Sequence, residues 1–197
     1  MNALILASAS AVRARLLREA GVPFDVRPAE IDEGDIKALL AGKLGADGIA
    51  GVLAERKAIK ISTAHPQALV LGCDQTLAFD GRLIDKAADL AAAQALLHEM
   101  RGKEHSLFTA CVLAQDGVPV WRRLEHSRLW MRPFSDAFLD DYLRTEGNKL
   151  LGSVGCYHLE GSGIQLFERV EGDYFSVLGL PLIPLLAALR EHRMIGR

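Results

Sequence analysis

The sequence predicts an α/β protein built on an elongated, mixed β-sheet flanked by helices. Near the N-terminus, short apolar runs alternate with helical patterns, which is typical of a βαβ unit with parallel strands. Farther along, long alternating strands follow one another, as in antiparallel pairs. The chain has 197 residues, of which 50% are hydrophobic and 24% charged. We therefore predict one domain over residues 1–197, large enough for one good core and folded as two lobes.

Charge and cysteine usage exclude several classes of protein. The 23 basic and 25 acidic residues are intermixed and give a formal net charge of -2. This predicts no binding to nucleic acid and none to a membrane, although a small anionic ligand needs only a few local cations. No apolar stretch reaches membrane-spanning length, and the N-terminus lacks the basic region of a signal peptide. Cys73, Cys111 and Cys156 are far apart. We predict buried, reduced thiols in a cytoplasmic protein.

The first strand and helix form a candidate anion site. Leu4–Ala7 is a short apolar strand, and Ser8-Ala9-Ser10 then leads into a helix over 11–20 that Gly21 ends. The N–H groups of a helix N-terminus favour a phosphate, and Ser8 and Arg13 would lie beside it. The alternative is plain N-capping by serine, with a solvated arginine.

The next elements carry charged side chains, and their sequence patterns do not by themselves indicate a functional site. Phe24–Pro28 alternates as a strand, and Ile31–Asp35, which contains Glu33, reads as a solvated acidic turn. Residues 37–48 predict a short helix and a mobile loop. A helix over 49–64 follows, and a lysine on its polar faces, such as Lys57, could reach a cleft.

The stretch Ala68–Leu77 begins with an apolar run of five residues rich in Leu and Val. This run predicts a buried strand that stops at Gly72-Cys73-Asp74-Gln75. Ligands of open α/β sheets bind at the carboxyl ends of strands. Asp74 is therefore the first candidate for chemistry. Taken alone, the alternative that Asp74 caps a turn is the commoner situation.

The remaining elements follow from turn and cap signals. Asp80-Gly81 and Asp116-Gly117 predict tight turns, and Ser135 and Gly147 bound a helix over 136–146. The other expected elements are a helix over 88–100, strands over 105–113, 118–132 and 164–170, and a final helix beginning at Leu180-Pro181. His105 and Thr109 share one face of their strand, where we expect them to support a cleft.

Seven short motifs occur in an order that resembles the Maf nucleotide pyrophosphatases, which belong to the fold group of the inosine triphosphatases. The resemblance runs from Leu4 to about Leu189. Each motif is unspecific alone, but the ordered set is not. The motifs are LASAS-x-x-R at 6–13, Asp32-Glu33, Lys57-Ala58, Gly72-x-Asp74, Asp85-Lys86, Gly102-x-x-His105 with Thr109, and 167–182 with EGDYFSVLGLPL.

The resemblance implies an enzyme that hydrolyses a nucleoside triphosphate between its α and β phosphates, in a central nucleotide cleft. By similarity, Asp74 is the general base, and Glu33 and Asp74 bind Mg²⁺ or Mn²⁺. Lys57 and Lys86 join the catalytic set, and Ser8 and Arg13 bind the triphosphate. A cation beside Asp74 is expected to lower its pKa. The family also implies a homodimer.

Departures from the commoner family pattern cluster where the nucleobase should bind. Val12 and Ser153 replace an arginine and a lysine, while Gln75 and Glu160 replace a threonine and a glutamine. Gln75 and Glu160 are similar to the branch acting on 7-methyl-GTP, and a carboxylate at Glu160 suits a guanine that carries a positive charge. The substrate-binding set is therefore Ser8, Val12, Arg13, Gln75 and Glu160. Alternatives are the branch acting on dTTP and UTP, or a lapsed nucleotide-binding regulator of septum formation.

Overall fold

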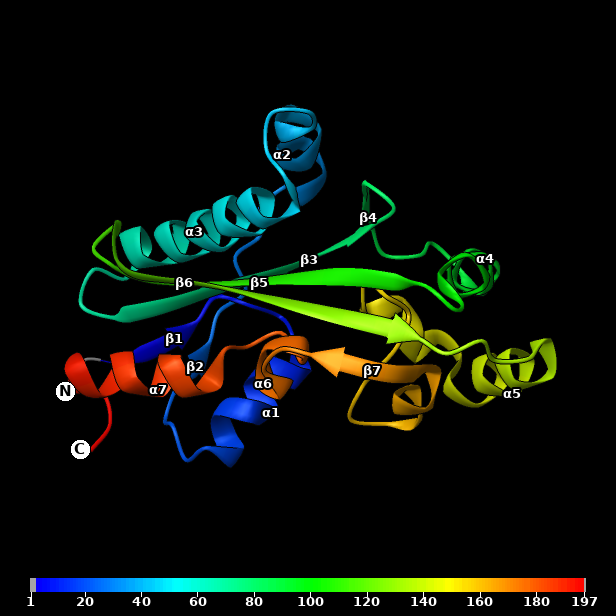
Figure 1. Cartoon of the computed structure of the whole chain (residues 1–197). Coiled ribbons are helices and arrows are strands. Elements are labelled where there is room, and N and C mark those ends of the chain that lie inside the picture. The colour runs from blue at the N-terminus through cyan, green and yellow to red at the C-terminus, as the bar shows by residue number, and fades with distance from the viewer. Residues whose placement is uncertain (1–2, 197) are drawn as a thin grey trace. The chain divides into compact units, whose positions relative to one another are not determined.

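The computed structural model describes residues 3–196 and contains one seven-stranded sheet (Figure 1). The strand order is β2-β1-β3-β5-β6-β7, and β4 pairs with β3. β1 is parallel to β2 and β3, whereas β4 on β3 and β7 on β6 are antiparallel. The prediction of a mixed sheet flanked by helices is confirmed. The strands are β1 Leu4–Leu6, β2 Asp25–Val26, β3 Leu69–Phe79, β4 Arg82–Ile84, β5 Glu104–Gln115, β6 Val118–Met131 and β7 Phe167–Glu171.

Most helices begin at a side chain that accepts a backbone N–H, as Ser10, Asp32, Asp89, Ser135 and Asp173 do. The helices are α1 Ala11–Glu19, α2 Glu33–Leu40, α3 Ala46–Ala64, α4 Leu90–Met100, α5 Asp136–Glu146, the 3-10 helices η1 Gly147–Gly152 and η2 Ser162–Leu166, α6 Tyr174–Val177 and α7 Leu182–Glu191.

The chain divides into two compact units. The first contains residues 1–75, 109–125 and 173–197, and the second contains residues 76–108 and 126–172. Three strands, β3, β5 and β6, contribute residues to both units. That residues 1–197 form one domain stays a prediction.

The first unit places helices on both faces of its strands. Alternate β3 residues Leu69, Leu71 and Cys73 join a buried cluster with residues of α1 and α7 on one face. On the other face α3 approaches at Gly72, where an added Cβ would lie 2.2 Å from the Ala54 carbonyl oxygen. Only glycine fits this contact, so Gly72 lets α3 lie directly on β3 (Figure 1).

The second unit contains a small aromatic cluster around His105. The imidazole Nε2 lies 2.8 Å from the Tyr157 hydroxyl, and the rings of Tyr157 and Phe167 pack against the imidazole. Burial lowers the pKa of His105 to about 4. His105 therefore supports the packing of this unit as a neutral side chain.

We expect His105 to make folding stability fall in mild acid. Its folded pKa lies below its ordinary value, so the unfolded chain binds the proton first and stability is lost as the pH falls from about 6.5 towards 4. The loss from this group between about pH 7 and pH 5 is about 2 kcal/mol. Urea unfolding of His105→Gln at both pH values should show a smaller loss than the wild type. His126→Gln, an exposed histidine, is the control, and equal losses in all three proteins would contradict the assignment.

Several predictions based on turn and helix-cap residues are confirmed. Asp80 and Gly81 both have positive φ in the β3–β4 turn, as do Asp116 and Gly117 between β5 and β6. The helix over 136–146 has the predicted bounds, with Ser135 as its N-cap and Gly147 at its end. All three cysteines are free and buried, as predicted.

Three predictions about secondary-structure elements were wrong. Ile31–Asp35 is not a turn, because Asp32 accepts from the Asp35 N–H and starts helix α2. Over 37–48, where a short helix and a loop were predicted, α2 reaches Leu40 and α3 begins at Ala46. Residues 164–166 belong to η2, so only the end of the expected 164–170 strand forms β7. The third error is the predicted end of the strand that carries Asp74, since β3 continues to Phe79.

Candidate functional site

A buried lysine between two carboxylates forms the centre of the candidate site. Lys57 Nζ lies 2.6 Å from Asp74 Oδ1 and 2.6 Å from Glu33 Oε1. Asp74 comes from β3, Lys57 from α3 and Glu33 from the first turn of α2. The side chains of Lys57 and Asp74 are 9% and 8% exposed, whereas that of Glu33 is 43% exposed. One ammonium group thus holds a buried and a half-exposed carboxylate together.

Asp74 lies within β3 rather than at its end, which corrects the sequence prediction. Pairing with β1 reaches Leu71, and antiparallel pairing with β4 begins at Leu77. The strand continues because the β3–β4 hairpin extends it past the polar residues. On the edge of β3 that faces β1 and β4, Asp74 therefore lies between the end of one pairing and the start of the other, while β5 is the neighbour on the opposite edge.

Burial raises the pKa of Asp74, despite the opposing charges of Lys57 and Arg13. The expectation that a nearby cation lowers this pKa was wrong, because it left out the cost of removing the carboxylate from water.

Ser8 and Arg13 are brought together at the start of α1. Arg13 Nη1 donates to Ser8 Oγ at 3.0 Å and to the Cys73 carbonyl at 3.2 Å. Arg13 Nε donates to the Gly179 carbonyl at 2.8 Å. Three oxygens from separate segments hold the guanidinium, so Arg13 is a fixed positive charge beside the residue that precedes Asp74.

Gln75 ties β3 to β5 and α6. Its Nε2 donates to Thr109 Oγ1 at 2.8 Å and to the carbonyls of Ser176 and Val177 at 3.0 and 3.1 Å. Thr109 also donates to the Ser176 carbonyl at 2.8 Å. Thr109 thus supports its neighbours structurally, as predicted. Sequence reasoning missed α6 as a neighbour of Gln75, since the acceptors are backbone carbonyls about 100 positions away and no residue type marks them.

Val12 packs, partly buried, against the apolar cluster that contains α1. Ser153 closes a turn, since its hydroxyl donates to the Tyr157 carbonyl and accepts from the Tyr157 N–H. Lys86 and Glu160 belong to the second unit.

Glu33 and Asp74 have the right chemistry for a divalent metal ion. Mg²⁺ prefers hard oxygens and is commonly held by one or two carboxylates, with substrate phosphates and water completing its coordination. Among residues 3–196, no group of three or more His, Cys, Asp or Glu could hold a metal ion. Two carboxylates suit an ion whose remaining ligands come from a phosphate substrate and water.

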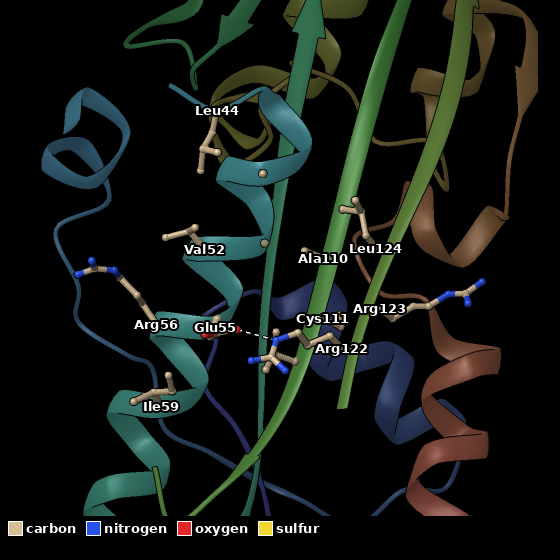
Figure 2. Close-up of a pocket in the computed structure, with 13 residues that line it drawn as sticks. Leu44, Val52, Glu55, Arg56, Ile59, Ala110, Cys111, Arg122, Arg123 and Leu124 are labelled. Atoms are coloured by element: carbon tan, nitrogen blue, oxygen red, sulfur yellow. Dashed lines mark hydrogen bonds and ion pairs between the residues drawn. The ribbon is translucent and has the colours of Figure 1, made fainter. Parts of the chain in front are cut away.

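An open groove of ≈ 770 Å³ runs along α3 in the first unit (Figure 2). Leu44, Val52 and Ile59 lie on one side, and Ala110, Cys111 and Leu124 come from β5 and β6. Glu55 and Arg122 form an ion pair at 2.7 Å across it.

Over the described residues, no helix is both long and apolar enough to cross a membrane.

Comparisons with known proteins match nearly the whole chain. The family model for Maf-like proteins matches residues 3–192. A nucleoside triphosphate pyrophosphatase of Caulobacter vibrioides is 51% identical, over 98% of this chain and 96% of the relative. A 7-methyl-GTP pyrophosphatase of Rhizobium etli is 46% identical, over 95% of each chain. Among solved structures, a dITP/XTP pyrophosphatase of Mycobacterium abscessus has a TM-score of 0.44 and 14% identity, over 96% of this chain and 93% of that chain.

Proposed function

Because the chain belongs to the Maf-like protein family, we propose that it is a pyrophosphatase that hydrolyses the α–β phosphoanhydride of a nucleoside triphosphate. The products are a nucleoside monophosphate and pyrophosphate. The observation that carries the proposal is the contact of Lys57 Nζ with both Asp74 and Glu33 at 2.6 Å.

In this reaction Asp74 accepts a proton from the attacking water. Lys57 fixes the Asp74 carboxylate through Oδ1. Glu33 and Asp74 would hold a divalent ion, which supplies charge neutralisation on the phosphates and a more acidic water. Arg13 adds a fixed positive charge, and Ser8 adds a hydroxyl at the start of α1. Phosphoryl transfer depends mainly on positioning and charge, so these groups suffice without a covalent intermediate.

The test of this proposal is pyrophosphate release from a panel of nucleoside triphosphates with Mg²⁺ or Mn²⁺ added and with chelator alone. We expect turnover that requires the metal, with a monophosphate as the second product. Release of inorganic phosphate and a diphosphate would instead indicate cleavage at the β–γ bond. Binding of nucleotides without turnover would favour the lapsed regulator.

We further propose a preference for a methylated guanine nucleotide such as 7-methyl-GTP. Glu160 supports it, because a carboxylate accepts hydrogen bonds from the guanine edge and complements the charge of a 7-methylated base. Relatives named 7-methyl-GTP pyrophosphatase are 44–46% identical, and others up to 51% identical carry the general name. Gln75 contributes by fixing α6 through its amide group. The same panel includes dTTP and UTP, whose preferential hydrolysis would favour the other branch.

Glu160→Gln is expected to lower the ratio of kcat/KM for 7-methyl-GTP to that for dTTP by about tenfold or more. The substitution replaces a charged acceptor by a neutral one, and a hydrogen bond to a charged group contributes about 1.5–3 kcal/mol. Glu168→Gln, at an exposed position of the second unit, is the matched control. A ratio that stays the same in Glu160→Gln would remove this residue from base selection.

A further inference from the structure

Two free thiols face each other beside the candidate site. Cys73 on β3 and Cys111 on β5 belong to neighbouring strands of the first unit, and their Sγ atoms are 3.1 Å apart. Both side chains are fully buried. The proposed hydrolysis uses neither thiol. Cys156, the third cysteine, lies in the second unit.

We propose that Cys73 and Cys111 are a redox modification site, at which an oxidant of the peroxide class converts the two thiols into an intramolecular disulfide that lowers activity. The thiols give up two protons and two electrons as the S–S bond forms. Hydrogen peroxide accepts the two protons and two electrons, its O–O bond breaks, and two molecules of water form. The effect on activity depends on the proposed function, whereas bond formation does not.

The geometry is close to that of a disulfide. An S–S bond is about 2.05 Å long, so the two sulfurs need to approach by only about 1 Å. A change of side-chain rotamer or a small strand shift can therefore close the bond.

Oxidant reaches the two sulfurs through local opening of the first unit. Cys111, like Cys73, belongs to the buried cluster that contains residues of α1 and α7, on the face of the sheet opposite α3. Hydrogen peroxide is little larger than water, and small local openings admit such molecules to buried positions. We expect slow but complete oxidation rather than the fast reaction of an exposed thiol.

Closing the bond would disturb residues that the site needs. Asp74 follows Cys73 directly, and the Cys73 carbonyl accepts from Arg13 Nη1. On β5, Thr109 lies two residues before Cys111 and bonds to Gln75 and Ser176. A shift of either strand therefore moves the Asp74 carboxylate relative to Lys57.

The protein is treated with hydrogen peroxide and denatured. Its free thiols are then alkylated and counted, and its mass is measured by mass spectrometry. We expect the three free thiols of the reduced chain to fall to one, with the loss of two hydrogen atoms and a peptide that links Cys73 to Cys111. Pyrophosphate release should fall about tenfold or more and return after dithiothreitol. An unchanged thiol count, or a linked peptide with undiminished activity, would overturn the proposal.

Two variants separate the pair from general oxidation. Cys111→Ser should keep its activity after peroxide and lose no hydrogen atoms, and Cys111→Ala serves if the serine variant does not fold. Cys156→Ser should behave as the wild type. Inactivation of the Cys111 variants by peroxide would contradict the assignment. If no nucleotide is hydrolysed, thiol count and mass still decide whether the bond forms, so the two proposals fail separately.

Discussion

Asp74→Asn is expected to lower kcat for pyrophosphate release by about 100- to 1,000-fold, with a smaller change in KM. Asparagine keeps the size of the side chain and can still accept from Lys57 Nζ, which lies 2.6 Å from Asp74 Oδ1. It cannot take a proton from water, and proton transfer by a positioned side chain contributes about 100- to 10,000-fold. It is also a weaker ligand for a divalent ion. Steady-state kinetics with the preferred nucleotide measure both parameters.

The matched control is Asp80→Asn. Asp80 lies just past the end of β3, in the β3–β4 turn, and its φ of 50° is one that asparagine readily adopts. This variant should keep wild-type kinetics. Thermal unfolding of both variants checks that they fold. If Asp74→Asn folds and turns over substrate at the wild-type rate, Asp74 is not the base.

Sequence patterns singled out site candidates that the structure brings into contact, but they misplaced the elements that carry them. The Gly72-x-Asp74 motif identified Asp74, but the strand end was placed too early, because polar residues inside a strand look like a boundary. Pairing of β3 with β4 over Leu77–Phe79 carries the strand onward. Asp80-Gly81 predicted the turn between β3 and β4, but a turn signal does not show how far back the strand before it extends. Glu33 was likewise identified in a supposed turn, since its helix depends on the Asp32 cap.

Long-range contacts to backbone atoms were beyond sequence reasoning. Arg13 was expected to face an anion, and the Gly179 and Cys73 carbonyls that hold it are 166 and 60 positions away. Carbonyls are present at every position, so no residue type predicts which one will be an acceptor. The predicted direction of the Asp74 pKa shift was wrong for a related reason. That direction depends on how deeply the carboxylate is buried, and only the packed fold defines its burial. The homodimer and the cytoplasmic location stay predictions.

Lys57→Met is expected to reduce both activity and stability. Methionine fills much of the lysine volume but leaves Asp74 buried beside Glu33 without the ammonium group. Removing one partner of a buried ion pair costs about 3–5 kcal/mol. The lower end is expected, because Glu33 remains 43% exposed and water screens it. Loss of a fixed donor at a reacting centre lowers kcat by about 100-fold or more. Urea unfolding and steady-state kinetics measure the two effects.

A double variant separates the lost charge pair from lost packing. If the cost of Lys57→Met comes from an uncompensated carboxylate, adding Asp74→Asn should restore about 1–3 kcal/mol of stability, since the neutral amide needs no counter-charge. Activity should not return, because the base is also gone. Lys60→Met is the control for helix α3: Lys60 is exposed and donates to the Glu30 carbonyl, so its loss should cost little. Strictly additive losses in the double variant would show that Lys57 acts through packing and not through its charge.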